Sequence, residues 1–382
     1  MDDFKTIETP ITGKVCVLVG TRPGIIRMSP LIKELEKKKV NFFVIHGGQH
    51  YSYQMDRIFF EDLELPEPKY KLEEVKNYKL HGEQTAEMLK GIERILVKEK
   101  PEIILVCGDA NVNLAGALAA RKLRIKVGHV EAGLRSNDWR MPEEHNRVII
   151  DHISEYLFAP TEQAKQNALT DNVCGKVFVT GNTIVDALME IRDIALRKSS
   201  ILDKLTLEAG KYFMLTAHRE ENVDTKHWIK ELIESIRYLS NEYSSMIIWP
   251  IHPRTEKRIR QFGFEDEVKI IQNLMVIDPV GYLDFIQLLS NAMCILTDSG
   301  GVQLEACILA VPCVTLREST EWNETLEIGC NILSGPDKQS IKQAIKQILH
   351  KDRVWTSPYG DGEASSRIVD IVLDGSISMK KG

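Results

Sequence analysis

The sequence lacks the short patterns that would assign a cofactor or a metal at once. No G-x-G-x-x-G segment follows a strand-like run, so NAD binding is not supported. The seven cysteines form no C-x-x-C pair and no cysteine–histidine cluster at zinc spacing. The sequence therefore gives no sign of a dinucleotide site or a zinc site. Most of the cysteines are predicted to be buried in the protein core. Free thiols of this kind fit a reducing cytoplasm.

Long apolar runs and a strong excess of one charge are also missing. No run approaches the ~20 residues that a membrane-spanning helix needs. The first residues, MDDFKTIETPITGK, lack the apolar stretch of a signal peptide. The net charge of −6 gives no sign of a broad nucleic-acid-binding surface. We expect a cytoplasmic protein with no membrane partner and no nucleic-acid partner.

What the sequence does contain is a regular alternation of strand-like and helix-like segments. The apolar runs at 14–19 and 103–107 are each followed by a helical pattern, the run at 40–45 is followed by a polar segment and then a helical pattern at 82–98, and the alternation resumes after a break. This predicts an α/β fold of parallel, doubly wound sheets covered by helices. In the second half we expect strands at 211–215, 246–250, 268–271 and 293–297.

The chain length of 382 residues favours two domains. We predict a first domain over 1–185 and a second over 186–363. The segment 364–382 is amphipathic and is predicted to be a C-terminal helix that packs back on the first domain.

Two short, apolar, strand-like runs each contain or precede a glycine and lead to a carboxylate. The run 103–107 leads to Asp109, the run 127–130 leads to Glu131, and a helical segment at 114–123 separates them. A strand–helix–strand unit of this kind places the two strands parallel, and we expect them to be neighbours. Both carboxylates then lie at the strand ends where ligands of open α/β sheets bind, and such a pair suits proton transfer.

Glycine turns follow a strand in each half of the chain. In 20–24 the turn precedes a helix, and Arg22 and Arg27 add positive charge near a helix N-terminus that favours an anion. In 297–306 the turn carries three residues that can face a diphosphate and one carboxylate that can accept from ribose hydroxyls: Ser299, Gly300, Gly301 and Glu305. The alternatives are a Gly-Pro turn with surface arginines and an ordinary capped helix start.

Basic residues follow two further strands of the second half. His218 can donate to a phosphate or act as a general acid, and Arg219 can bind a phosphate bidentately. His252 follows another strand and suggests a similar role more weakly. Arg317 begins a polar segment that can close over a base or a sugar.

The segment 142–147, PEEHNR, brings further carboxylates close after Glu131 in the chain. These carboxylates are further candidates for chemistry. The alternative is a solvated helix start, because acidic residues favour the first turn of a helix.

These segments together resemble the non-hydrolysing UDP-N-acetylglucosamine 2-epimerases over nearly the whole chain. HVEAGLRS with DSGGVQLEA in one chain is highly specific. The matching segments are GTRPGIIR at 20–27, CGDA at 107–110, HVEAGLRS at 129–136, PEEHNR at 142–147, TGNTIVD at 180–186, TAHREEN at 216–222 and DSGGVQLEA at 298–306.

The resemblance implies a GT-B-like fold, with two Rossmann-like domains and the active site in the cleft between them. It implies interconversion of UDP-N-acetylglucosamine and UDP-N-acetylmannosamine through elimination of UDP, without cofactor or metal, by a homodimer. The implied acid–base candidates are Asp109, Glu131 and Glu143, with His218 on the departing diphosphate. The implied substrate-binding residues are Arg22, Arg27, Arg135, Arg219, His252, Ser299, Gly300, Gly301, Glu305 and Arg317.

The chain departs from the family pattern at several positions. Gly24 and Arg27 replace a glutamate and a lysine, and Trp322 replaces an arginine. Bacterial members bind a second substrate molecule as an activator through a G-Q-H loop and a later arginine. Gln49 and His50 match that loop, whereas Glu87 stands at the position of the arginine, so we expect this activation to be impaired.

Three other functions fit parts of the pattern. A hydrolysing relative would release UDP and free N-acetylmannosamine from the same intermediate. A GT-B glycosyltransferase would share the nucleotide site but would not need the three carboxylates. A non-catalytic sensor of UDP-sugars would bind without turnover.

Overall fold

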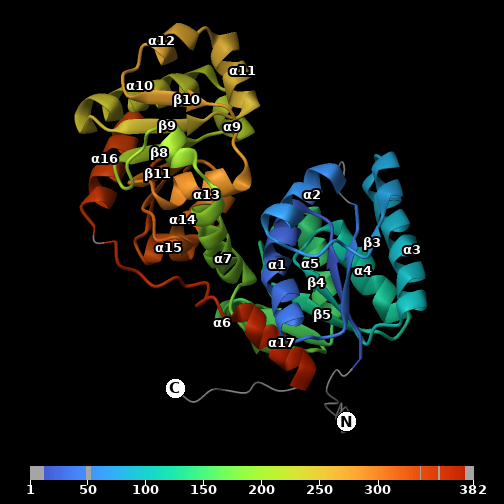
Figure 1. Ribbon diagram of the computed structural model, residues 1–382. Coiled ribbons are helices and arrows are strands. Elements are labelled where there is room, and N and C mark those ends of the chain that lie inside the picture. Colours follow the sequence, from blue (N-terminus) through green and yellow to red (C-terminus); the bar gives the residue numbers. More distant parts are fainter. Residues whose placement is uncertain (1–12, 49–52, 336, 352, 375–382) are drawn as a thin grey trace. The chain divides into compact units, whose positions relative to one another are not determined.

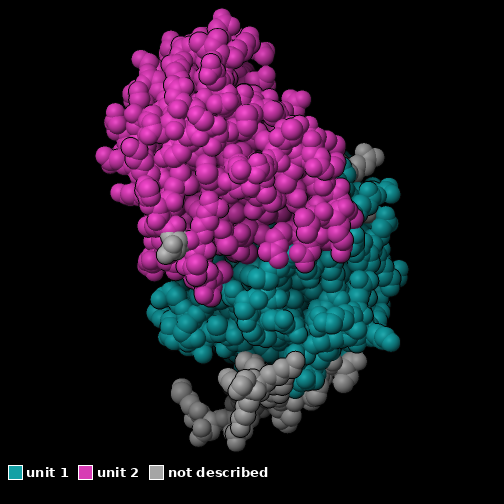
Figure 2. Space-filling model, turned by 60° about the vertical axis from the view of Figure 1, so that its left-hand side comes forward, with its two compact units in different colours: residues 1–190, 359–382 teal, residues 191–358 magenta. Residues whose placement is uncertain are grey.

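The structure is a computed structural model that describes residues 13–48, 53–335, 337–351 and 353–374. These residues form two compact units (Figures 1 and 2). Unit 1 contains the described part of residues 1–190 and 359–382, and unit 2 contains that of residues 191–358.

Unit 1 is built on a seven-stranded sheet in the order β3-β2-β1-β4-β5-β6-β7, and every neighbouring pair is parallel. The central strands have almost no polar residues because helices cover both faces of such a sheet. The strands are β1 (Val15–Val19), β2 (Phe42–His46), β3 (Tyr70–Lys71), β4 (Ile103–Cys107), β5 (Lys126–Val130), β6 (Tyr156–Ala159) and β7 (Lys176–Val179).

The helices of unit 1 follow these strands in the chain. They are α1 (Arg22–Lys37), α2 (Tyr53–Asp62), the 3-10 helix η1 (Glu73–Asn77), α3 (His81–Glu99), α4 (Asn111–Lys122), α5 (Pro142–Ile153), α6 (Glu162–Thr170), the first part of α7 (Thr183–Lys198) and α17 (Ala364–Asp374). Helix α17 packs against α1, and an ion pair joins Lys38 to Asp370.

Unit 2 is built on a six-stranded parallel sheet in the order β10-β9-β8-β11-β12-β13. Its strands are β8 (Tyr212–Thr216), β9 (Met246–Pro250), β10 (Leu274–Ile277), β11 (Cys294–Thr297), β12 (Cys313–Thr315) and β13 (Asn331–Leu333). Its helices are the end of α7, α8 (Ile201–Lys204), α9 (Glu220–Val223), α10 (Lys226–Tyr243), α11 (Pro253–Phe262), α12 (Glu265–Lys269), α13 (Tyr282–Ser290), α14 (Gly300–Ile308), α15 (Asn323–Glu327) and α16 (Lys338–Leu349).

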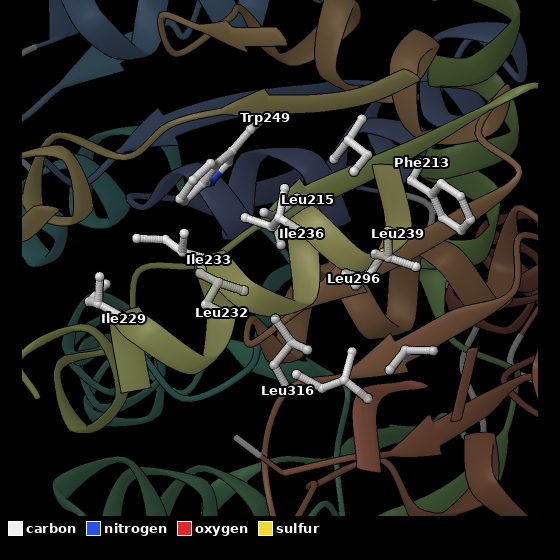
Figure 3. Packing of buried hydrophobic residues seen from close by; sticks show 14 of the residues in the cluster. Phe213, Leu215, Ile229, Leu232, Ile233, Ile236, Leu239, Trp249, Leu296 and Leu316 are labelled. Atoms are coloured by element: carbon white, nitrogen blue, oxygen red, sulfur yellow. The ribbon is translucent and has the colours of Figure 1, made fainter. Parts of the chain in front are cut away.

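Helix α10 shows how the apolar period of a helix builds the core of unit 2 (Figure 3). Its residues Ile229, Leu232, Ile233, Ile236 and Leu239 recur at helical spacing and are all buried. They belong to one cluster with strand residues that include Phe213, Leu215, Trp249 and Leu296. Burying side chains of this size contributes about 1.5–3 kcal/mol each, which holds the helix on the sheet.

The predicted α/β class with two doubly wound parallel sheets is confirmed. The strand expected at 268–271 is wrong, because α12 ends at Lys269 and the strand is β10, Leu274–Ile277. Val268 instead reaches the core from the end of α12, and Ile271 reaches it from the irregular segment before β10. A short apolar run does not distinguish these cases by its period alone.

The domain limits 1–185 and 186–363, with 364–382 as a C-terminal helix, stay a prediction. Within the residues that the structure describes, no helix has the length and apolar character to cross a membrane. The same residues contain no group of three or more His, Cys, Asp or Glu side chains arranged to hold a metal ion.

Candidate active site

Four of the predicted site segments follow the strands at which the strand order of each sheet reverses. In the first sheet the reversal lies between β1 and β4, and in the second between β8 and β11. Ligands of open parallel sheets bind beyond the carboxyl ends of the strands at such a point. The turns that follow these four strands lead to Arg22, Asp109, His218 and Ser299.

Asp109 follows β4 and is held by two residues of α5. Its carboxylate forms an ion pair with Arg147, and its backbone carbonyl accepts a hydrogen bond of 2.8 Å from Nδ2 of Asn146. Sequence reasoning selected only Glu143 from α5 and missed both residues. A linear run of charges does not say which member faces another strand end, although the motif PEEHNR contained them.

Glu131 follows β5 and is buried, with only 7% of its surface exposed. Its Oε2 lies 3.1 Å from Nη1 of Arg27 and accepts a hydrogen bond of 3.9 Å from Sγ of Cys107. Burial and the nearby Glu131 carboxylate raise the pKa of the Cys107 thiol, so this thiol is a neutral donor. The structure thus brings a cation and a weak donor from two other elements to this carboxylate.

The two acidic residues at the start of α5 have different surroundings. The side chain of Glu143 is exposed and has no hydrogen bond or ion pair with a described residue. Glu144 is buried and accepts from Ser136, from the backbone N–H of Asn137 and from Arg147. Burial acts to raise the pKa of Glu144, but these donors outweigh it and lower the pKa. Glu144 therefore fastens the loop before α5 and also holds Arg147.

The remaining predicted residues of unit 1 have different surroundings. Arg22 is the first residue of α1, and its guanidinium lies 5.6 Å from the ring centre of Phe59. The guanidinium of Arg135 lies 2.7 Å from Asp151 and 2.8 Å from Asp171, so a ligand would compete with two internal carboxylates. A ligand role for Arg135 stays a prediction. Gln49 and His50 lie outside the described residues.

In unit 2 a buried carboxylate that sequence reasoning missed organises the site. Asp298 follows β11 and accepts from the backbone N–H groups of His218 and Arg219, at 3.0 and 2.9 Å, and from Nδ2 of Asn222 at 3.2 Å. Burial acts to raise the pKa of Asp298, but hydrogen bonds from His218, Arg219 and Asn222 lower it. Asp298 therefore fixes the turn after β8 to the end of β11.

The two predicted histidines lie together above this turn. Nδ1 of His218 is 3.3 Å from Oδ1 of Asp298, and the ring centres of His218 and His252 are 5.4 Å apart. His252 caps α11, because its Nδ1 accepts from the backbone N–H of Arg254. Burial, with His218 and Arg254 nearby, lowers the pKa of His252. Both histidines line a cavity of about 190 Å³ with Thr216, Pro250, Phe285 and Ser299 among its other walls.

Helix α14 begins at Gly300, and its first N–H groups have no partner inside the helix. A Cβ atom at Gly300 would lie 1.8 Å from Oε1 of Glu321, so glycine is needed for this carboxylate to approach the first turn. Glu321 also lies 2.8 Å from Nη1 of Arg317 and 3.6 Å from Nη2 of Arg219. An internal anion thus occupies the position where a helix N-terminus and two arginines converge.

Glu305 lies one turn further along α14. It accepts a hydrogen bond of 2.8 Å from the hydroxyl of Tyr282. Burial raises the pKa of Glu305 to about 7, although the Tyr282 hydrogen bond acts to lower it. Tyr282 is a further residue that the sequence reasoning did not select.

Comparison with known proteins adds independent evidence. The family model for UDP-N-acetylglucosamine 2-epimerase matches residues 33–373. The UDP-N-acetylglucosamine 2-epimerase of Methanocaldococcus jannaschii is 50% identical over 366 residues, which cover 95% of this chain and 99% of that protein.

Two solved structures of the enzyme from the same organism resemble this one. One, of UDP-GlcNAc 2-epimerase, has a TM-score of 0.89 at 49% identity and covers 95% of this chain and 100% of that chain. The other, in complex with UDP-GlcNAc and UDP, has a TM-score of 0.78 at 50% identity and the same coverage. The chain therefore belongs to the UDP-N-acetylglucosamine 2-epimerase family.

Proposed function

We propose that this protein interconverts UDP-N-acetylglucosamine and UDP-N-acetylmannosamine without net hydrolysis. The observation that carries the proposal is the pair of carboxylates, Asp109 and Glu131, at the ends of adjacent parallel strands. Each of them contacts an arginine from another helix, Arg147 or Arg27, and these contacts set where the carboxylate oxygens lie.

The reaction explains why such a pair is needed. The proton at C2 of the sugar is not acidified by a carbonyl group, so a carboxylate removes it while the C1–O bond breaks. The electron pair of that bond leaves with UDP, and a C1–C2 double bond forms in 2-acetamidoglucal. Re-addition of UDP with a proton delivered to the opposite face of C2 completes the inversion. Removal and delivery on opposite faces call for two groups, with Asp109, Glu131 and Glu143 as the candidates.

The groups in unit 2 suit the departing diphosphate. His218 and Arg219 offer N–H donors, and the first turn of α14 offers backbone N–H groups at the positive end of a helix dipole. Such donors stabilise the negative charge that develops on the leaving group. Glu305 can accept from ribose hydroxyls. The complex of the M. jannaschii relative with UDP-GlcNAc and UDP supports this class of ligand.

The proposal needs no cofactor and no metal, and it includes a homodimer that acts in the cytoplasm. The product would supply N-acetylmannosamine-type sugars for cell-surface polysaccharides or other glycans. Activity after dialysis against EDTA and a mass near twice 43.4 kDa by light scattering are the expected results.

Proton NMR of UDP-N-acetylglucosamine with the purified protein in D₂O tests the reaction. A stable mixture of two UDP-sugars with deuterium at C2 is expected. UDP with free N-acetylmannosamine would instead identify the hydrolysing reaction. No change in the spectrum, with or without added UDP, would contradict both.

A further inference from the structure

A fully buried histidine and aspartate lie beneath the two carboxylate turns of unit 1. His129 is on β5 and Asp151 is near the end of α5, and neither side chain is exposed. Nε2 of His129 lies 3.1 Å from the carbonyl oxygen of Gly108, and Nδ1 lies 2.6 Å from Oδ1 of Asp151. Because both oxygens can only accept, each ring nitrogen faces an acceptor. The ring therefore joins α5 to the residue directly before Asp109.

The second oxygen of Asp151 reaches the other turn. Oδ2 accepts a hydrogen bond of 3.0 Å from the backbone N–H of Gly133 and lies 2.7 Å from Nη2 of Arg135. Burial acts to raise the pKa of Asp151, but His129 and Arg135 favour the anion and lower this pKa. One carboxylate thus contacts the imidazole that holds the Asp109 turn and the backbone that follows Glu131.

The Glu131 turn needs such support. The backbone of Glu131 has a φ of +66°, in the left-handed region that residues other than glycine rarely adopt. A backbone of this kind costs about 1–3 kcal/mol and persists only where the surroundings determine it fully. A Cβ atom at Gly133 would lie 2.0 Å from the carbonyl oxygen of Ala164, so the turn is also tightly packed.

We propose that His129 and Asp151 are positioning residues that hold the Asp109 and Glu131 turns in register for proton transfer at C2. This inference rests on the proposed function for the roles of the two carboxylates. Neither residue is assigned any contact with the substrate. Loss of either residue should lower kcat, because displacement of a reacting group by about 1 Å can lower the rate about 10²-fold.

Three substitutions separate the two bonds of the imidazole. The amide nitrogen of His129→Gln takes the place of Nε2 and can still donate to Gly108. That of His129→Asn takes the place of Nδ1 and can still donate to Asp151 but not to Gly108. Asp151→Asn keeps the shape but turns one acceptor into a donor. We expect kcat to fall about tenfold or more in H129N and D151N. In H129Q most of the wild-type kcat should be retained. The affinity for UDP should stay at the wild-type value in all three variants.

Ser154→Ala is the matched control. Ser154 is buried three residues after Asp151 and donates to the carbonyl of Ile150, so the substitution removes a buried hydrogen bond without touching either turn. Its kcat should stay at the wild-type value. Equal, wild-type kcat in H129N, D151N and S154A, with only lower unfolding temperatures, would overturn the proposal. So would a parallel loss of UDP affinity and kcat.

Hydrogen–deuterium exchange read by mass spectrometry does not depend on turnover. Peptides over 108–113 and 130–136 should exchange faster in H129N and D151N than in the wild type and S154A, with the rest of unit 1 unchanged. Unchanged exchange there would overturn the positioning role. A wild-type protein without turnover would contradict the proposed function, while this readout would still decide whether the network holds the turns.

Discussion

The two strand-end regions that carry the candidate residues differ in how their charges are satisfied. In unit 1 Asp109 and Glu131 contact arginines from other helices, and buried His129 and Asp151 hold their turns. In unit 2 Arg219 and Arg317 lie around the start of α14, and the half-exposed Glu321 is the carboxylate that approaches both of them. We expect unit 1 to be preorganised for proton transfer, and we expect an incoming anion to compete with Glu321 in unit 2.

The largest expected effect concerns the carboxylates of unit 1. Asp109→Asn and Glu131→Gln should lower turnover by about 10²-fold or more, because each removes a proton acceptor while keeping the shape. UDP affinity, measured by isothermal titration calorimetry, should remain close to that of the wild type if the nucleotide is held by unit 2. Near-normal turnover in both variants would remove the acid–base assignment.

Arg147 tests whether preorganisation matters apart from charge. Arg147→Lys keeps the positive charge but has a single nitrogen, whereas the guanidinium contacts Asp109 through Nη2 and Glu144 through Nη1. We expect kcat to fall about tenfold with little change in KM, measured by coupled steady-state kinetics. The exposed Arg140, which pairs only with Asp138 among the described residues, provides the control substitution Arg140→Lys. A wild-type kcat in R147K would show that orientation by this arginine is unimportant.

The stability of the folded protein should depend on pH through Glu305 of unit 2. Its pKa is raised from 4.5 to about 7 in the folded state, so the native protein binds more protons than the unfolded chain between these values. Stability should therefore fall as the pH rises through this window, by about 1–3 kcal/mol. Urea unfolding at pH 5 and pH 8 should show this fall in the wild type and a smaller one in Glu305→Gln. The same pH dependence in both proteins would rule out Glu305 as its source.

The smallest expected effect concerns the internal anion of unit 2. Glu321→Gln should bind UDP about two- to fivefold more tightly, because the diphosphate would no longer compete with the Glu321 carboxylate for the arginines. The gain should be small, because a half-exposed ion pair of this kind contributes little. Affinity for uridine, which lacks the diphosphate, should not change. Glu318→Gln makes the same charge change at an exposed position in the same segment. Equal effects of the two substitutions would point to net charge alone.

Local patterns were enough to predict much of the fold. The alternation of apolar runs and helical periods indicated parallel sheets, and β4 and β5 are adjacent and parallel as expected. The strand expected at 268–271 failed because a short apolar run can be buried from a helix end as well as from a strand. Strand ends with Asp109, Glu131 and His218 were readable because a turn after a buried strand has a local signature.

The amino-acid sequence by itself determined the fold class, the strand-end turns and the resemblance to an epimerase family, since these depend on residues near one another in the chain. Only the tertiary structure decided the partners of those turns. Arg147 is 38 residues from Asp109, and Asp298 is 80 residues from His218. Hydrogen bonds and ion pairs act over a few ångströms in space and leave no periodic trace in a single sequence, so folding alone brings such groups together.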